Sequence, residues 1–173
     1  MNYSLNIKKF FTSTQPEENK THSNISISKK SSSPKTILVL FPFEENFFRV
    51  ASYSYRNLPY DRDNIEFHYL INRNFIDSFS LRRGNIHKMD LDDKLNIVNK
   101  NSLLVQLNKS NFDIIIDLNI SYNQKMEDFI LMQDSNYKIG FKHKKSDLLY
   151  NVQLDISKSQ IAENGYQKIL ELI

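Results

Sequence analysis

Short apolar runs alternate with longer amphipathic segments along most of the chain, and this alternation predicts its secondary structure. Residues 35–41, which read Lys-Thr-Ile-Leu-Val-Leu-Phe, and the three isoleucines at 114–116 are too short for buried helices and rich in β-branched side chains. Such runs are typical of strands that are covered on both faces, as parallel sheets require. We therefore predict that they form the central strands of a sheet.

Amphipathic segments between and after these runs predict helices. Residues 44–58 place Phe47, Phe48, Ala51, Tyr55 and Leu58 on one helical face, and residues 157–173 place Ala162, Tyr166, Ile169, Leu170 and Ile173 on another. Shorter helices are expected at 72–81, at 102–109 and after Asn119, and further strands at 64–71, 86–89, 138–141 and 148–154. This order predicts an α/β domain: a single Rossmann-like, doubly wound, mostly parallel sheet with helices on both faces.

The first 34 residues differ in composition from the rest and predict a disordered basic leader before a Rossmann-like domain at 35–173. They are rich in Ser, Thr, Asn and Lys and contain too few apolar residues to offset the entropy of ordering. Their apolar residues Tyr3, Leu5, Ile7, Phe10 and Phe11 flank Lys8 and Lys9. That pattern suits peripheral contact with an anionic membrane surface, such as the inner membrane, or docking on a partner.

Charge and composition limit the classes of function. Residues 1–35 hold six lysines against two glutamates, whereas the whole chain has a net charge of +3, so the folded part is close to neutral. A nearly neutral domain is not expected to bind nucleic acid. The chain has no cysteine and no apolar run of membrane-spanning length, and its start lacks the apolar core of a signal peptide. We predict a cytoplasmic protein.

Polar residues at the expected carboxyl ends of the strands are the candidate binding residues. Asp117 and Asn119 follow the isoleucine run, at the edge where open α/β sheets bind their ligands. A carboxylate at this position can instead cap the turn that follows it. The basic run 142–145, Lys-His-Lys-Lys, offers Lys142 and Lys144 to a phosphate or acidic head group, and a solvated loop is its alternative.

Sites for metals and nucleotide cofactors are not predicted. His68 lies inside a strand pattern without a second histidine or acidic partner at ligand spacing, so we interpret it as a packed or edge histidine. The three glycines form neither a G-x-G-x-x-G motif nor a P-loop. We therefore predict no cofactor.

Two motifs in a fixed order give the chain a family resemblance. Residues 112–119 read Phe-Asp-Ile-Ile-Ile-Asp-Leu-Asn, and residues 138–141 read Lys-Ile-Gly-Phe. This pair resembles the N-terminal, acceptor-side domain of the heptosyltransferase-like GT-B glycosyltransferases, bacterial enzymes that build the inner core of lipopolysaccharide. The resemblance implies one of two Rossmann-like domains, of which the C-terminal one binds the nucleotide-sugar. It covers residues 35–173, so the second domain is expected to be lacking.

The sequence departs from this family where the family has its catalytic base, an Asp that follows Gly in the loop after the first strand. An ungapped alignment places Asn46 and Phe47 at these two positions. Glu44 or Glu45 would substitute only if the loop shifted, and first-turn helix residues are their alternative interpretation. Asn46 joins Asp117, Asn119, Lys142 and Lys144 in the predicted ligand-binding set.

Three functions remain open at the level of the sequence. The first is a non-catalytic, stand-alone homologue of the acceptor-side domain, acting as a binding or partner module in cell-envelope glycan or lipopolysaccharide assembly. The second is half of a split glycosyltransferase that another chain completes, and the third is an unrelated Rossmann-like or flavodoxin-like domain for a small ligand. We favour the first. A glycan or glycolipid acceptor is the predicted ligand, and the C-terminal helix is the predicted surface for a protein partner or self-association.

Overall fold

The computed structural model describes residues 36–56, 58, 64–80, 83–157 and 161–173. The predictions for the leader lie outside these residues, and the chain divides into the units Met1–Ser33 and Pro34–Ile173. None of the helices in the described part is long and apolar enough to cross a membrane.

The second unit contains one six-stranded sheet in which every pairing is parallel, in the order β3-β2-β1-β4-β5-β6. The strands are β1 (Thr36–Leu40), β2 (Glu66–Asn72), β3 (Asn85–Met89), β4 (Phe112–Asp117), β5 (Ser135–Phe141) and β6 (Val152–Leu154). The two runs predicted to be central, now β1 and β4, lie side by side in the middle of the sheet.

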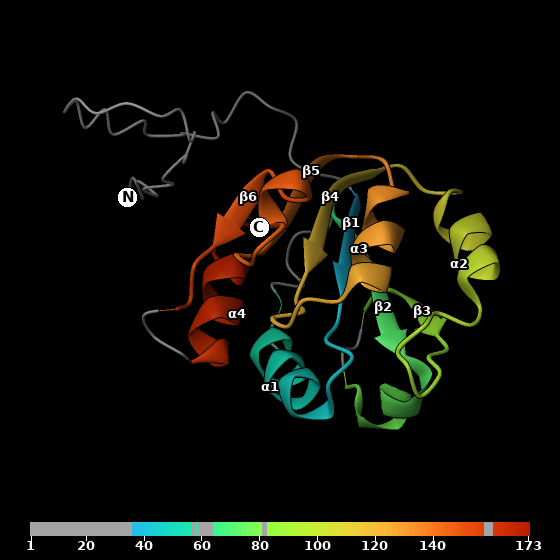
Figure 1. Ribbon diagram of the computed structural model, residues 1–173, viewed down its shortest axis with the longest axis horizontal. Coiled ribbons are helices and arrows are strands. Elements are labelled where there is room, and N and C mark those ends of the chain that lie inside the picture. The colour runs from blue at the N-terminus through green and yellow to red at the C-terminus, as the bar shows by residue number, and fades with distance from the viewer. Residues whose placement is uncertain (1–35, 57, 59–63, 81–82, 158–160) are drawn as a thin grey trace. The chain divides into compact units, whose positions relative to one another are not determined.

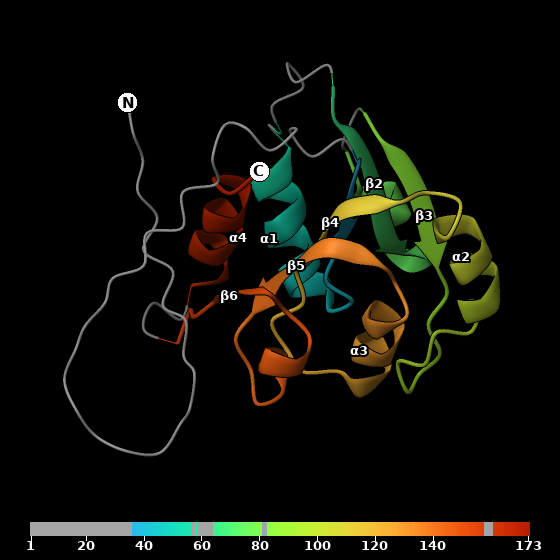
Figure 2. The ribbon, with the colours of Figure 1, turned by 90° about the horizontal axis from the view of Figure 1, so that it is seen from above.

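Helices cover both faces of the sheet (Figures 1 and 2). Helices α1 (Glu45–Tyr55) and α4 (Ala162–Leu170) pack on one face, and α2 (Lys100–Leu107) and α3 (Gln124–Leu131) on the other. Two short 3₁₀ helices, η1 (Arg73–Ser78) and η2 (Ser146–Leu148), follow β2 and β5. The predicted fold, a doubly wound sheet of Rossmann-like type, is confirmed.

The sheet separates two apolar clusters, because successive residues of a covered strand point to opposite faces. Ile37 and Val39 of β1 face α1 and α4, whereas Leu38 and Leu40 face α2 and α3. Phe41 follows β1 and is fully buried. Its ring makes edge contacts with Phe48, Tyr55, Tyr69 and Phe79, with centroids 5.0 to 6.1 Å apart.

Several predicted boundaries are wrong: β5 begins at Ser135 rather than at residue 138, whereas other elements are shorter than predicted. The segment 72–81, predicted to form a short helix and a turn, contains the 3₁₀ helix η1, and the strand predicted at 148–154 begins at Val152 because η2 precedes it. Phe47, predicted on the buried face of α1, stays partly exposed. The apolar stripe of the last helix packs in the core of this same domain.

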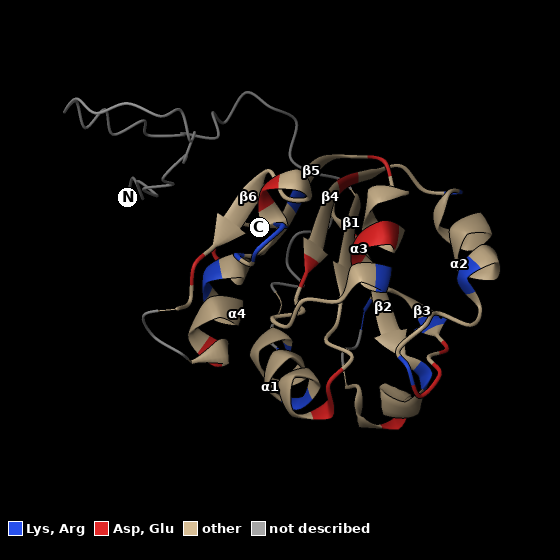
Figure 3. Cartoon of the chain, viewed as in Figure 1, with Lys and Arg blue, Asp and Glu red and all other residues tan. Residues whose placement is uncertain are grey.

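Charged side chains are interspersed along the described chain, as Figure 3 shows. Acidic and basic residues occur together on α1, α3 and α4 and in the segment after β3 rather than separating onto opposite sides. The described elements thus carry charges of both signs, and local clusters must supply any electrostatic recognition.

Candidate functional site

The carboxyl ends of β1 and β4 meet where the winding of the sheet reverses, which is the place where such sheets form a ligand crevice. Asp117 is the last residue of β4, and its side chain is only 3% exposed. Its Oδ1 accepts hydrogen bonds from the backbone N–H of Asn119 at 2.9 Å and from the Asn119 side-chain amide at 2.7 Å. The hydroxyl of Tyr150 donates to its Oδ2 at 2.6 Å. Both oxygens of the carboxylate are therefore engaged inside the protein.

Asn119 joins this carboxylate to the loop after β1. Its Oδ1 accepts a hydrogen bond from the backbone N–H of Phe43 at 3.1 Å. Phe41, Pro42 and Phe43 are all buried, so the first part of that loop lies packed against the end of the sheet. We call the four residues Phe43, Asp117, Asn119 and Tyr150 the clamp, because together they hold the two loops of the crevice closed.

Gly140 explains how Tyr150 reaches Asp117. A Cβ atom at Gly140 would lie 2.4 Å from Tyr150 Cζ and 2.6 to 2.7 Å from both Cε atoms, so the ring lies directly over the glycine. Tyr150 is 6% exposed and has no room to move away. The glycine of the Lys-Ile-Gly-Phe strand thus provides the space for a phenol that crosses β5 to the end of β4.

The electrostatics of the clamp follow from its burial. Burial raises the pKa of Asp117, and the hydrogen bonds from Tyr150 and Asn119, together with the nearby His143, act in the opposite direction. Burial, and then the adjacent Asp117, raise the pKa of Tyr150. Tyr150 therefore stays protonated and donates, which suits a structural bond better than proton transfer near neutral pH.

The raised pKa of Asp117 predicts a pH dependence of stability. The folded state binds the carboxyl proton more tightly than the unfolded state, so this group lowers the free energy of unfolding as the pH rises from about 3.9 through the raised value. Asp117→Asn lacks this titration. Urea unfolding measures the free energy of unfolding of the variant and of the wild type. The amount by which the variant's value falls below that of the wild type is expected to shrink between about pH 4 and pH 7. A deficit that grows over this range would contradict the prediction.

The predicted residues of the loop after β1 do not reach the crevice. Glu44, Glu45 and Asn46 are exposed, and Glu45 pairs with Arg49 one helical turn later at 2.5 Å. Glu44 precedes α1 and Glu45 begins it, as first-turn residues do. None of the three approaches Asp117 through a described hydrogen bond, so the structure does not bring the predicted set together.

The basic run after β5 forms a second group of polar residues near the clamp. Lys142 pairs with Asp155 at 3.2 Å, whereas Lys144 and Lys145 are exposed. The His143 ring contacts Tyr150 and Tyr122 edge-on, with centroids 5.8 and 5.5 Å away.

On the other side of the His143 ring, its Nε2 lies 3.5 Å from a carboxylate oxygen of Glu127. The ammonium of Lys145 lies 5.4 Å from the centroid of the Tyr122 ring. We call Tyr122, His143, Lys144 and Lys145 the basic rim. The basic run itself was visible in the sequence. Its neighbours Glu127 and Tyr150 were not predicted as binding residues, because only folding brings them to it.

His68 is buried in β2, as predicted for a packed histidine, but it has histidine and acidic partners that spacing in the sequence did not reveal. Its Nδ1 lies 2.9 Å from Nε2 of His87, its Nε2 lies 3.0 Å from a Glu66 carboxylate oxygen, and the two imidazoles stack at 5.2 Å. Burial and the neighbouring His68 lower the pKa of His87. The partners are on adjacent strands, 19 positions apart. No cluster able to hold a metal ion is found among the described residues.

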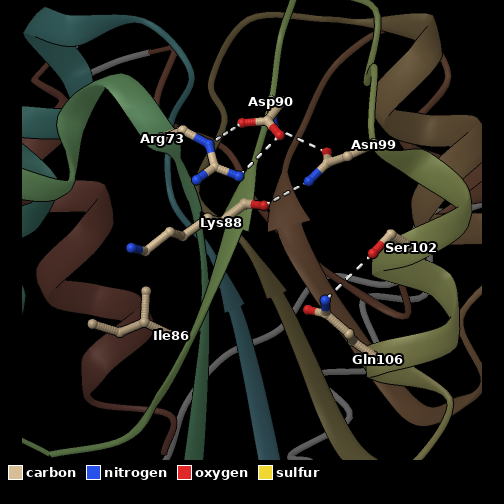
Figure 4. Close-up of a pocket in the computed structure, with 7 residues that line it drawn as sticks. All are labelled: Arg73, Ile86, Lys88, Asp90, Asn99, Ser102 and Gln106. Carbon is tan, nitrogen blue, oxygen red and sulfur yellow. Dashed lines mark hydrogen bonds and ion pairs between the residues drawn. The ribbon is translucent and has the colours of Figure 1, made fainter.

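An open cavity of about 420 Å³ lies beside β3, at the opposite end of the sheet from β6 (Figure 4). Its lining is polar except for one isoleucine: Arg73, Ile86, Lys88, Asp90, Asn99, Ser102 and Gln106. The guanidinium of Arg73 forms a two-point ion pair with the Asp90 carboxylate. None of these seven residues belongs to the ligand-binding set predicted from the sequence.

Comparisons with known proteins establish the fold. No protein-family model and no curated protein matches the sequence. The structure is similar to the E. coli heptosyltransferase WaaC with ADP, at a TM-score of 0.61 and 13% identity over 79% of this chain and 47% of that chain. The same enzyme with ADP-2-deoxy-2-fluoro heptose gives the same values. A glycosyl transferase family 9 structure from Veillonella parvula is also similar, at a TM-score of 0.61 and 18% identity. This match covers 80% of this chain and 41% of that chain.

The chain therefore spans less than half the length of each of these three structures. The heptosyltransferase-like fold predicted from residues 112–119 and 138–141 is confirmed by this likeness, which at such low identity concerns the fold.

Proposed function

We propose that this domain is a non-catalytic binding module with a heptosyltransferase-like fold, and that it recognises a phosphorylated sugar head group at the basic rim. The ligand class agrees with a role in assembling cell-envelope glycans or lipopolysaccharide. The observation that carries the proposal is the clamp, which keeps the polar side chains of Asp117 and Asn119 buried, whereas Lys144 and Lys145 of the basic rim are exposed.

Four features of the clamp and of the start of α1 argue against sugar transfer. A general base must come within hydrogen-bond distance of the proton that it removes. Asp117 is buried with both oxygens already accepting hydrogen bonds, and Glu45 is paired with Arg49 on the surface. Phe47, at the position aligned with the family's catalytic Asp, has no ionisable group. A substrate hydroxyl in this crevice would first have to displace Phe43 from Asn119.

The basic rim has the chemistry to bind a phosphorylated sugar. Lys144 and Lys145 are exposed cations on one loop, and ammonium groups attract a phosphate. The Tyr122 ring is 43% exposed, so it offers a face against which a sugar ring can pack. His143 contacts Tyr122, Tyr150 and Glu127. These contacts fix the position of the loop that carries Lys144 and Lys145.

The catalytic part of the proposal is tested by a transfer assay. The full chain is incubated with an ADP-heptose donor and a lipopolysaccharide inner-core acceptor, and product is measured by mass spectrometry. No transfer above the rate without protein is expected. Transfer that disappears in Glu44→Gln or Glu45→Gln would overturn the proposal and favour the alternative of half a split glycosyltransferase.

The binding part is tested by calorimetry with glucose 1-phosphate, with glucose and with inorganic phosphate. We expect glucose 1-phosphate to bind best, and Lys144→Glu/Lys145→Glu to weaken it about tenfold or more because two attractive charges become repulsive. Lys109→Glu/Lys168→Glu changes the net charge equally at exposed positions outside the rim and should leave binding unchanged.

The source of the sugar phosphate is distinguished by vesicles that contain lipid A. Binding to these vesicles but not to free glucose 1-phosphate identifies a glycolipid head group, whereas the reverse identifies a free sugar phosphate. Equal affinities of the rim variant and the wild type for every probe would refute the role of the rim.

A further inference from the structure

Strand β3 is a terminal strand of the sheet, so one of its two edges has no neighbouring strand among the described residues. The N–H and C=O groups of alternate residues point to the same edge of a strand. In β3 the open edge can be identified, because the side chain of Asn99 binds there. Its amide donates to the carbonyl of Lys88 at 2.9 Å and its Oδ1 accepts from the N–H of Asp90 at 2.9 Å.

Asn99 thus occupies the position of a residue in the next strand of the sheet. A residue in a parallel neighbour also donates to one residue of β3 and accepts from the residue two positions later. The same edge continues toward the start of β3, where the N–H and C=O of Ile86 and the N–H of Lys88 face outward. Within the described residues, no hydrogen bond to these three groups is found. The edge therefore has pairing capacity that Asn99 uses only at one end.

The open cavity lies along this unused part of the edge (Figure 4). Ile86 and Lys88 of β3 line one side of it, and Ser102 and Gln106 of α2 line the other. Ser102 and Gln106 are four positions apart, so they lie on the same face of the helix. A strand placed here would have β3 on one side and polar α2 side chains on the other.

We propose that the β3 edge binds an extended peptide segment of a partner protein, which adds a seventh strand to the sheet. This mode of recognition obtains affinity from backbone hydrogen bonds and specificity from alternate side chains. The cavity volume of about 420 Å³ accommodates a few residues, which matches the short unpaired stretch of β3. The proposal concerns a different surface from the basic rim and does not depend on the proposed function.

The side chains of β3 indicate the chemistry of this peptide. Ile86 and Lys88 point to the same side of the edge, as Figure 4 shows. Ile86 is 44% exposed, and no ion pair to Lys88 is found in the part of the chain that the structure describes. The neighbouring positions of an added strand therefore favour an apolar residue beside Ile86 and an acidic residue beside Lys88. The peptide is expected to carry these two residues two positions apart.

A second copy of this chain fits the edge less well. The β3 strand of another molecule would bring its own Lys88 to the same short stretch, where like charges opposite each other are destabilising. An acidic strand removes this repulsion and gives Lys88 a partner. The proposed occupant is therefore a foreign acidic segment rather than a second β3.

The test uses the full chain, labelled with ¹⁵N, and two acetylated, amidated pentapeptides, Thr-Val-Thr-Glu-Thr and Thr-Glu-Thr-Val-Thr, one for each strand direction. At peptide concentrations up to about 5 mM, one of them is expected to shift the amide signals of Ile86 and Lys88. It should also slow the hydrogen exchange of the Lys88 amide. Replacing Glu by Lys in that peptide is expected to weaken binding about fivefold.

Two variants assign the effect to the edge. Lys88→Glu should reverse the preference, so that the Lys-containing peptide binds better than the Glu-containing one. Ile86→Pro removes an outward N–H without removing a bond to β2, because proline is tolerated on the free side of an edge strand. It should abolish binding while the remaining amide signals keep their positions. Lys168→Glu, on α4, is the charge control and should bind like the wild type.

The proposal is overturned if neither peptide shifts the β3 amides at these concentrations, or if Lys88→Glu leaves the preference unchanged. Signals of β3 that change with protein concentration in the absence of peptide would show that a second copy occupies the edge, which also overturns it.

Discussion

Replacing Asp117 by alanine is expected to lower the free energy of unfolding by about 3 to 5 kcal/mol, because it leaves a set of buried donors without an acceptor. The hydroxyl of Tyr150 and the backbone and side-chain amides of Asn119 all donate to this carboxylate. Asn119 would also lose the contacts that orient its Oδ1 toward the N–H of Phe43. Urea unfolding measures the loss.

Asp117→Asn is the matched control for this prediction. The new side-chain amide at position 117 retains an oxygen for the Asn119 donors. The Tyr150 hydroxyl can rotate so that its oxygen accepts a hydrogen bond from the nitrogen of this amide. Asp117→Asn is expected to lower the free energy of unfolding by less than half as much as Asp117→Ala does. A loss of less than about 1 kcal/mol in Asp117→Ala would contradict the prediction, because it would mean that the clamp contributes little to holding the two loops together.

Gly140→Ala is expected to destabilise the domain by about 3 kcal/mol, since the new methyl group overlaps the ring of Tyr150. The ring cannot easily move, because its hydroxyl is bound to Asp117 and its surroundings are packed. The substitution should also lengthen or break the bond between Tyr150 and Asp117. Denaturant unfolding gives the free energy, and the fluorescence of the tyrosines follows the change in environment.

A double-mutant cycle separates this clash from a general effect on β5. In the background of Tyr150→Leu, which removes the ring, adding Gly140→Ala is expected to cost less than about 1 kcal/mol. The coupling energy between the two positions is then about 2 kcal/mol. Equal costs of Gly140→Ala in both backgrounds would show that the glycine is needed for β5 itself rather than for the tyrosine above it.

Much of the fold could be predicted because its signals are local. The β-branched runs at 35–41 and 114–116 have no polar face, so they can be stable only where both faces are covered. The stripe of α4 likewise requires an apolar surface, and the core of this domain supplies it. Element lengths were less predictable. Residues 72–81 have helical spacing, but only one 3₁₀ helix of six residues forms there.

The site could be located but not interpreted from the sequence. Asp117 and Asn119 were placed at the carboxyl edge because parallel strands end there together, and they do lie next to each other. Their role depends on Tyr150, 33 positions after Asp117, and on Phe43, 76 positions before Asn119. Nothing near Asp117 in the sequence signals either contact. Gly140 was the one available indication, because glycine inside a strand often marks a close approach by another group.

The sequence by itself determined the alternation of strands and helices, the burial of the central strands and the edge at which their polar ends collect. These properties follow from the spacing of apolar residues over a few positions, which each segment contains within itself. Only the tertiary structure decided that Asp117 is sealed by Tyr150, that Asn119 holds Phe43 and that His68 pairs with His87. It also decided that part of the β3 edge has no partner within the described residues. These outcomes depend on which distant segments become neighbours, and strand order is set by the packing of the whole sheet rather than by any one segment.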